Sequence, residues 1–406
     1  MSSIKSAVID YKPSEMNGND HYDGSRPWKL DATNIKVTIN KNPRTVPDPG
    51  SAEERSQKVC SDHMVSAVWT LKDGWQQPEI TPYGPLPIMP TANVLHYATE
   101  CFEGLKLYRG MDGKLRLFRP LANCARMVKS AERISLPGFE PEALVEMIRR
   151  LCAMDGSKWL PAHCRGSFLY IRPALIGTDP CLGFEVPKEA LLYVVISYWP
   201  QPSYSDGARG LRLLASEAEE LRAWPGGTGF AKIGPNYGPA LKAHGRAKRT
   251  GCDQVLWLYG EDCQITEAGS SNVFIVRRES NRQLQMVTPP LEGGSILAGV
   301  TRQSILELVR ARLSGDTTKE VGPVESIEKN FTMGELLQDL SDGNLEGVFI
   351  CGTAAFVTSI SVIEFRGRTI ELPNNNLALV SLLRKWLFDI MYGGEKSEWA
   401  DIIEEF

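Results

Sequence analysis

The sequence predicts two domains of the α/β (α+β) class, and three observations lead to this prediction. The chain has 406 residues, which is more than one ordinary hydrophobic core holds. Apolar strand-like runs alternate with helical patterns on both sides of the middle of the chain. The stretch WPQPSYSDGARG is rich in Pro, Ser and Gly, as linkers are. We therefore expect a smaller domain at 1–200 with an extended N-terminal arm, a linker at 201–210, and a larger domain at 211–406.

Composition excludes several classes of partner. The hydrophobic fraction of 42% and the charged fraction of 23% are those of a globular protein, and the formal net charge is −4. No cluster of Lys and Arg is dense enough for nucleic acid, and no apolar run approaches the ~20 residues of a membrane span. The nine cysteines and five histidines show no metal-ligand spacing, so no metal is expected. The first residues carry neither a secretory nor an Arg-rich transit pattern, which indicates a cytoplasmic protein.

The elements of the first domain follow from local patterns. Residues 1–55 are polar and rich in Pro, Asn and Gly, as an extended arm with little core would be. VSAVWTL is a strand, and the alternating runs at 105–109 and 114–118 around a Met-Asp-Gly turn predict a hairpin. Pro120 suits the first turn of a helix. A second helix buries Leu144, Met147, Ile148 and Leu151, which recur at helical spacing, and the strands SFLYIRPAL and ALLYVVIS follow.

The second domain shows the same mixture. AHGRAKRTG is helical, and QVLWLYG and NVFIVRR are apolar strands. A helix is expected over residues 301–313, with Thr301 as its N-cap. GVFICG and SVIEF are further strands. A closing helix buries Leu379, Leu383, Trp386 and Ile390 and ends at the two glycines 393–394.

One lysine lies in an unusual setting. In GGTGFAKIGPNYG, residues 226–238, Lys232 is the single cation among glycines, a proline and a tyrosine. An isolated lysine in a loop is most often a solvated surface residue. The other interpretation is an amine that forms an imine with an aldehyde cofactor, pyridoxal phosphate above all.

That cofactor needs an acid at its pyridine nitrogen, a donor at its phenolate oxygen, backbone donors for its phosphate and a cation to balance the phosphate charge. The sequence contains candidates for these groups. Tyr237 could donate a hydrogen bond to the phenolate oxygen, and Glu267 could face the pyridine nitrogen. The segments LAGVTRQ and CGTAA, which open a helix and follow a strand, could cradle the phosphate with backbone N–H groups. Each of these signals is weak when taken alone.

The motifs together resemble the eukaryotic branched-chain aminotransferases, which are pyridoxal-phosphate enzymes of fold type IV. The matching stretches extend in order from about residue 59 to the C-terminus: DHM, LHYATECFEGLKLYRG, LFRPLANCARM, LYIRPALIGT, WPGGTGFAKIGPNYG, CDQVLWLYGEDCQITEAGSSNVF, TPPL, GVTR and CGTAA. The resemblance implies a homodimer that transfers the amino group of leucine, isoleucine or valine to 2-oxoglutarate. It also implies ping-pong kinetics, with pyridoxal 5′-phosphate as the cofactor and amino acids and 2-oxo acids as the partners.

The resemblance also implies roles for individual residues. Lys232 would be the catalytic lysine that binds the cofactor, Tyr237 the phenolate donor and Glu267 the partner of the pyridine nitrogen. The phosphate and ring would further contact Arg126, Ser270, Val300, Thr301 and Thr353. Arg172 would meet the distal carboxylate of glutamate or 2-oxoglutarate. The remaining substrate contacts would be Tyr97, Phe102, Tyr170, Thr353 and Ala354.

The sequence departs from the animal members of the family at two places, and two alternative functions remain open. Cys60 stands where animal members carry a phenylalanine of the pocket rim, and Ala355 and Thr358 replace a pair of cysteines. One alternative is a fold type IV enzyme for a specialised amino acid, a D-amino acid or an (R)-amine, or an aminodeoxychorismate lyase; the long arm, LYIRP and the lysine stretch argue against it. The other is a non-catalytic relative that binds the cofactor, which intact Lys232, Tyr237 and Glu267 disfavour.

Overall fold

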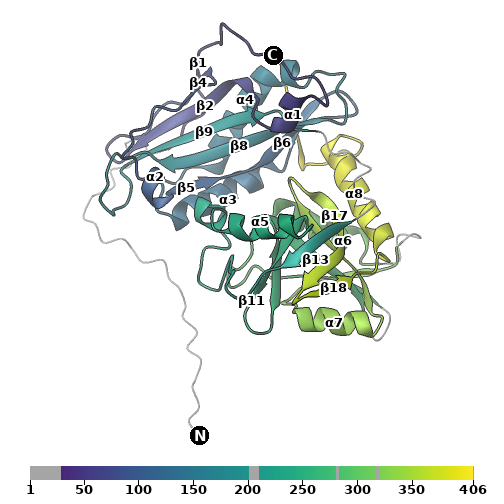
Figure 1. Cartoon of the computed structure of the whole chain (residues 1–406). Coiled ribbons are helices and arrows are strands. Elements are labelled where there is room, and N and C mark those ends of the chain that lie inside the picture. The colour runs from purple at the N-terminus through teal and green to yellow at the C-terminus, as the bar shows by residue number, and fades with distance from the viewer. Residues whose placement is uncertain (1–28, 201–209, 280–282, 316–320, 406) are drawn as a thin grey trace.

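The computed structural model describes residues 29–200, 210–279, 283–315 and 321–405. These residues form two mixed sheets flanked by helices, one in the first half of the chain and one in the second (Figure 1). The predicted α/β (α+β) class is confirmed. The predicted linker lies almost entirely outside the described residues, between the last strand of the first half and the first strand of the second.

The first sheet has ten strands in the order β1-β4-β2-β9-β8-β6-β7-β19, with β3 beside β2 and β5 beside β8. Most neighbours are antiparallel, and the predicted hairpin is present as β6 and β7, which pair through Leu107 and Leu117. The strands are β1 Lys36–Val37, β2 Cys60–Thr70, β3 Gly74–Trp75, β4 Glu79–Pro82, β5 Glu100–Phe102, β6 Leu105–Arg109, β7 Leu115–Phe118, β8 Phe168–Gly177, β9 Glu189–Ser197 and β19 Ala400–Ile403.

Two long helices cover one face of this sheet. They are α3 Pro120–Arg133 and α4 Pro141–Trp159, and the short helices are α1 Ala52–Ser56 and α2 Val94–Tyr97. Pro120 occupies the first turn of α3, as predicted. The four apolar residues predicted for α4 are all fully buried in one core with alternate residues of the strands, Leu192 and Val194 among them. This alternation leaves the other side chains of β8 and β9 for the opposite face of the sheet.

The arm contributes more to the core than the sequence suggested. Residues 1–28 lie outside the described part of the chain, but Leu30 and Ala32 are buried in the first core. The segment that follows is held by polar bonds. The backbone N–H of Asn40 donates to His63 Nε2 over 2.8 Å, and that of Arg44 donates to Asp62 Oδ1 over 2.6 Å. Buried polar acceptors on β2 thus provide the anchoring that the sequence of the arm does not reveal.

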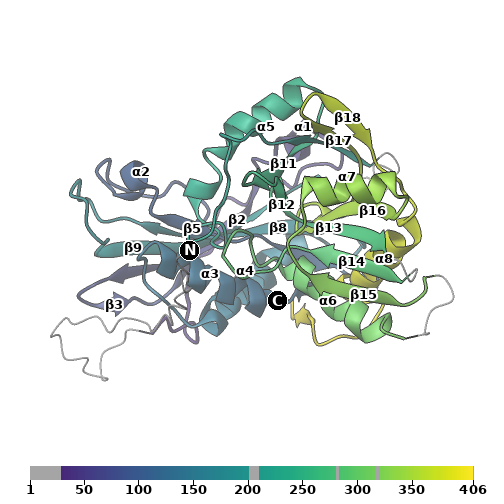
Figure 2. The same ribbon diagram turned by 90° about the horizontal axis from the view of Figure 1, so that it is seen from below.

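The second sheet has nine strands, and β12 pairs with both β11 and β13. Helices α6 and α8 lie against it, and α5 and α7 pack beside β11 and β16 (Figure 2). The elements are β10 Leu211–Ala215, η2 Gly234–Asn236, α5 Ala240–Arg249, β11 Gln254–Tyr259, β12 Gln264–Ala268, β13 Ser271–Arg278, β14 Leu284–Thr288, α6 Val300–Arg312, β15 Val324–Glu328, α7 Met333–Ser341, β16 Leu345–Gly352, β17 Phe356–Phe365, β18 Arg368–Glu371 and α8 Leu377–Met391.

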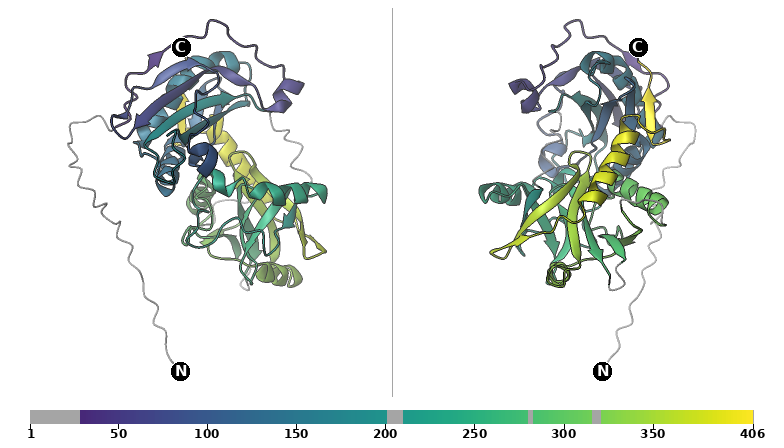
Figure 3. Two further views of the ribbon diagram at one scale, coloured as in Figure 1. Left: turned by 60° about the vertical axis from the view of Figure 1, so that its left-hand side comes forward. Right: turned by 90° about the vertical axis from the view of Figure 1, so that its right-hand side faces the viewer.

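Two details of the second half differ from the predictions. The N-cap of α6 is Gly299 rather than Thr301, because the helix already begins at Val300 and Thr301 is buried in its first turn. After α8 the chain returns to the first sheet, where β19 pairs with β7 (Figure 3). There Glu405 forms a two-point ion pair with the fully buried Arg109, at 2.5 and 2.9 Å. The last residues therefore fasten the second half of the chain to the first sheet.

No helix of the described residues is long and apolar enough to cross a membrane.

Candidate functional site

The turn that carries Lys232 is packed into the first core. Ala231 and Ile233 are fully buried there, whereas Lys232 between them is half-buried. Ile233 forms a bridge with Cys101 on β5, and the N–H of Phe102 donates to the carbonyl of Lys232 over 3.0 Å. The N–H of Lys232 itself donates to Ser130 Oγ on α3 over 2.8 Å. Since its neighbours point into the core, the lysine side chain leaves the turn on the opposite side, where it is half-buried rather than fully exposed to solvent.

A short 3₁₀ turn, η2, brings Tyr237 back to the lysine. Lys232 Nζ lies 3.1 Å from the Tyr237 hydroxyl and 5.0 Å from the centre of the Phe102 ring. The rings of Phe102 and Tyr237 are 4.9 Å apart. Gly234 at the start of η2 lies so close to Glu100 that a Cβ there would meet the Glu100 carboxylate, which would have to move. Gly234 therefore lies at a close contact between the two halves of the chain.

Glu267 is a buried carboxylate at the end of β12, with 1% of its surface exposed. It forms a close ion pair with the buried Arg222. Its Oε1 accepts from Asn272 Nδ2 over 3.1 Å and from the N–H of Leu297 over 3.2 Å. Burial raises the pKa of Glu267 above its ordinary value, and Arg222 opposes that shift. A carboxylate with a raised pKa is a stronger base than usual and is suited to hold a proton on a neighbouring ring nitrogen.

Arg126 lies on α3 one turn before Ser130, so both side chains lie on the same face of the helix as Asn123. Its Nε and Nη2 donate to the two oxygens of Glu103 over 2.6 and 2.8 Å, and its Nη1 donates to the carbonyl of Ala298 over 2.8 Å. Burial lowers the pKa of Arg126, but the Glu103 carboxylate outweighs this effect and leaves it raised. The guanidinium therefore stays charged beside the start of α6.

Three of the five predicted phosphate residues meet at a small cavity between the two sheets, which Arg126 and Ser270 do not line. Val300 and Thr301 at the N-terminus of α6 line it together with Thr353 in the β16–β17 turn. The first N–H groups of a helix have no partner within the helix, and they attract anions. Lys106 also lines this cavity. Its side chain is buried, its amine lies 3.8 Å from the centre of the Phe168 ring, and burial lowers its pKa to about 8.

The predicted substrate residues are partly brought together. Arg172 Nη2 lies 3.3 Å from the Tyr170 hydroxyl, and its guanidinium lies 4.8 Å from the centre of the Phe102 ring. Tyr97 instead donates to the carbonyl of Leu182 over 2.6 Å and packs against Phe184.

Three further positions of interest lie at the ends of strands. Ala354 lies beside Thr353 in the β16–β17 turn, and Ser270 lies in the turn between β12 and β13, close to Glu267 in the chain. Cys60, the departure at the pocket rim, is buried at the start of β2. It shares a row with Ser197 and Tyr170 across three strands, so it lies on the same face of the sheet as Tyr170.

Four charged or polar residues of this region were not predicted from the sequence: Glu103, Lys106, Arg222 and Asn272. Each is almost fully buried, so each needs a partner in the fold. Glu103 and Lys106 interrupt the apolar sequence of β5 and β6, and that interruption is the signal that could have identified them. Arg222 and Asn272 lie in segments of ordinary polarity, which contain no such signal.

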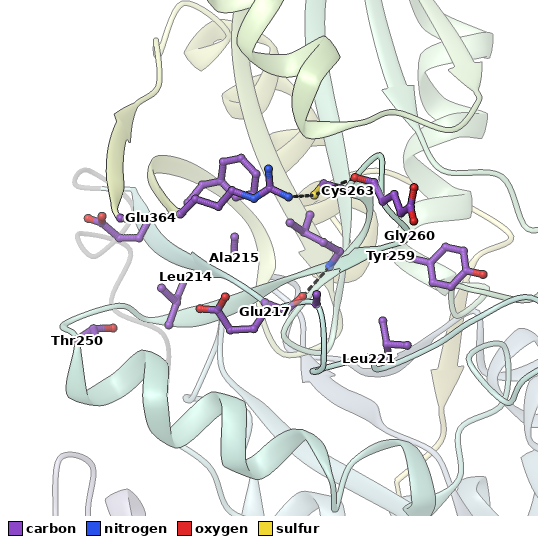
Figure 4. A pocket seen from close by; sticks show the side chains of 16 residues that line it. Leu214, Ala215, Glu217, Leu221, Thr250, Tyr259, Gly260, Cys263 and Glu364 are labelled. Carbon is purple, nitrogen blue, oxygen red and sulfur yellow. Dashed lines mark hydrogen bonds between the residues drawn. The ribbon is translucent and has the colours of Figure 1, made fainter.

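A larger pocket of about 860 Å³ lies elsewhere, at the ends of β10, β11 and β17 (Figure 4). Its wall includes Glu217, Glu261 and Glu364, and Arg366 Nη2 lies 3.3 Å from the thiol of Cys263. The pocket shares no lining residue with the predicted site. The candidate site is therefore chosen for its converging ionisable groups and not for the size of its cavity.

Comparisons with known proteins identify the family of the chain. Residues 100–363 match the family model "Amino-transferase class IV". The mitochondrial branched-chain-amino-acid aminotransferase of Schizosaccharomyces pombe is 41% identical over 379 residues, covering 92% of this chain and 86% of the relative. The cytosolic enzyme of Mus musculus is 42% identical over 356 residues, covering 87% and 88%.

Solved structures share the fold. The branched-chain aminotransferase of Thermoproteus uzoniensis with norvaline has a TM-score of 0.63 at 23% identity, covering 83% of this chain and 99% of that one. The branched-chain aminotransferase of Thermobaculum terrenum in its PLP-form has a TM-score of 0.63 at 21% identity, covering 83% and 98%. This chain belongs to the class IV aminotransferases, within the group of branched-chain-amino-acid aminotransferases.

Proposed function

We propose that this protein is a branched-chain-amino-acid aminotransferase that moves the amino group of L-leucine, L-isoleucine or L-valine to 2-oxoglutarate, and back. The observation that carries the proposal is the lysine amine 3.1 Å from a tyrosine hydroxyl, on a turn packed into the first core. The buried carboxylate of Glu267 acts electrostatically on Lys232, and Arg126 does so on Tyr237 and also bonds to the carbonyl of Ala298 just before α6. Burying ionisable groups is costly unless they are paired, and a protein that does not bind the cofactor would have no need of them here.

The residues present fit pyridoxal 5′-phosphate, the cofactor of this family. When bound, the cofactor supplies a conjugated ring that accepts electrons from the substrate carbon. Lys232 would hold its aldehyde carbon, Tyr237 its phenolate oxygen and Glu267 its ring nitrogen. Arg126, Ser270, Val300, Thr301 and Thr353 would hold the phosphate side. The donors fit because they combine one amine, one carboxylate and several N–H and O–H groups, as the charges of the cofactor require.

The substrate would be bound by the first half of the chain and by the β16–β17 turn. The Tyr170 hydroxyl and the N–H groups of Thr353 and Ala354 would receive the α-carboxylate. Arg172 would receive the distal carboxylate of 2-oxoglutarate, while Phe102 provides an apolar wall for a leucine side chain. Lys232 Nζ would take the proton from the substrate Cα and later return one, acting first as base and then as acid.

A panel of amino donors with 2-oxoglutarate tests the function directly. We expect the highest kcat/KM for leucine, isoleucine and valine, and formation of glutamate. A preference for a D-amino acid or an (R)-amine, or lyase activity without amino transfer, would contradict the proposal and favour the alternative fold type IV activities.

Substituting Arg172→Met should affect glutamate, which has a distal carboxylate, more than leucine, which has none. Removing one partner of a buried charge pair costs about 2–5 kcal/mol, so kcat/KM for glutamate should fall by about 30-fold or more, whereas leucine has no charge to lose. Arg165→Met in the exposed loop before β8 is the matched control and should leave both substrates unaffected. Equal losses for glutamate and leucine in Arg172→Met would rule out a role in binding the distal carboxylate.

We also propose that the protein is a homodimer. Apolar side chains are exposed around Tyr97, on the loop that it contacts: Leu182 is 57%, Phe184 91% and Val186 61% exposed. Exposed apolar groups gathered in this way favour a protein partner. Light scattering should give a mass of two chains, and Phe184→Glu should shift the equilibrium toward one chain. A monomeric wild-type protein would contradict the proposal.

The proposed compartment is the cytosol. All nine cysteines are free thiols, which favours a reducing environment. The relatives include both cytosolic and mitochondrial enzymes, so cell fractionation is the experiment that separates the two compartments.

A further inference from the structure

Glu103 is a completely buried carboxylate near the site, with 0% of its surface exposed. It lies in the short connection between β5 and β6 and accepts four hydrogen bonds. Two come from Arg126, one from Asn123 Nδ2 over 3.0 Å and one from the N–H of Gly104 over 3.0 Å. Burial alone would raise the pKa of Glu103, but Arg126, Lys232 and Asn123 together hold it below its ordinary value. These contacts favour the anionic form of Glu103, whose carboxylate accepts all four hydrogen bonds.

The pairing uses one particular edge of the Arg126 guanidinium. A guanidinium group presents two forked edges, one formed by Nε with one terminal nitrogen and the other by the two terminal nitrogens. Glu103 occupies the Nε–Nη2 edge. The remaining terminal nitrogen, Nη1, is directed at the carbonyl of Ala298, two residues before α6 begins. Through this bond the Nη1 side of the guanidinium lies next to the segment that leads into Val300 and Thr301.

We propose that Glu103 is a positioning residue, which fixes Arg126 so that its open edge and the N-terminus of α6 form a single site for the phosphate group of the cofactor. This inference rests on the proposed function. An arginine side chain has many rotamers, and a bidentate partner on one edge selects the rotamer before the ligand arrives. Asn123 and the N–H of Gly104 fix the carboxylate in turn.

The substitution Glu103→Gln tests this arrangement. Glu103 accepts all four of its hydrogen bonds. In glutamine one carboxylate oxygen is replaced by an NH2 group, which only donates and would therefore face at least one of these donor groups. Arg126 would then lose its fixed orientation. The measurement is the dissociation constant of the cofactor-free full chain for two probes, pyridoxal 5′-phosphate and pyridoxal, which differ only in the phosphate. We expect the constant for the phosphate ester to rise about tenfold or more, and that for pyridoxal to change by less than about twofold.

The two probes distinguish positioning from general damage. Equal losses for both probes would mean that Glu103 only supports the fold. An unchanged dissociation constant for pyridoxal 5′-phosphate would mean that Glu103 does not position Arg126, and a lower one would mean that its negative charge opposes the phosphate. Each of these results would overturn the proposal. Glu346→Gln is the matched control, because it breaks another partly buried Arg–Glu pair, with Arg278, in the second half of the chain; both probes should bind it normally.

A conservative variant covers the case in which Glu103→Gln does not fold. Glu103→Asp keeps the charge but withdraws the carboxylate by one methylene, so it should show a smaller loss confined to the phosphate ester. A loss shared equally with pyridoxal would again overturn the proposal. The proposed function fails separately, if the wild-type chain binds neither probe or forms no borohydride-reducible adduct with pyridoxal 5′-phosphate.

Discussion

Substituting Lys232→Ala should abolish the borohydride-reducible adduct with pyridoxal 5′-phosphate and lower turnover by at least about 10³-fold. The amine has two roles in the proposed reaction, because it holds the cofactor and also moves the proton at the substrate Cα. Its backbone is held by Ser130 and Phe102 whatever the side chain, so the turn should keep its conformation in the variant. Non-covalent binding of the cofactor should therefore persist.

The measurement combines absorbance of the bound cofactor, mass spectrometry after reduction and steady-state turnover. Lys242→Ala, on the exposed side of α5, is the matched control and should behave as the wild type. A covalent adduct that survives in Lys232→Ala would assign the cofactor to another lysine. Lys106, which also lies beside the predicted phosphate residues, would then be the next residue to test.

Substituting Glu267→Gln should lower kcat by about 10²-fold or more, because the carboxylate that keeps the ring nitrogen protonated would be lost. The free energy of unfolding should also fall, by about 3–5 kcal/mol, because the buried Arg222 would be left without its ion-pair partner. Chemical denaturation measures the second effect, and single-turnover kinetics measure the first. Glu261→Gln, in the exposed turn before β12, is the control for both measurements.

The pH dependence gives a second test of Glu267. Its raised pKa means that, as pH falls, the carboxylate takes up its proton at a higher pH than an ordinary glutamate does. The activity of the wild type should therefore decline on the acid side above the ordinary carboxyl range, and this limb should disappear in Glu267→Gln. Wild-type turnover in the variant would show that another group holds the proton on the ring.

Local sequence patterns were sufficient for most helices and strands. The hairpin of β6 and β7 follows from alternating apolar residues around a short turn, and Pro120 indicates where α3 begins. These features depend on neighbours a few residues apart, so local patterns describe them well. The capping residue of α6 was predicted wrongly, since Thr and Gly both follow the cap pattern and only the backbone distinguishes them.

Pairings between distant segments could not be predicted in this way. The strand β19 is short and polar at one end, and it becomes a strand because β7, far earlier in the chain, offers an unpaired edge. The ion pairs of Arg222 with Glu267 and of Glu103 with Arg126 also join separate segments of the chain, so local patterns could not predict them. A charged residue in sequence looks like a surface residue, and only its burial in the fold shows that it must be paired.

The sequence by itself determined the family and the fold class, and it singled out Lys232 as the candidate lysine, because long motifs such as GGTGFAKIGPNYG combine backbone requirements with reactive side chains. Only the tertiary structure decided how these parts act together. It placed Lys232 between two buried neighbours, aligned it with Tyr237, and oriented Arg126 through a carboxylate on another element. The physical reason is that hydrogen-bond and ion-pair geometry depends on distances of a few ångströms between segments far apart in the chain, which no local pattern records.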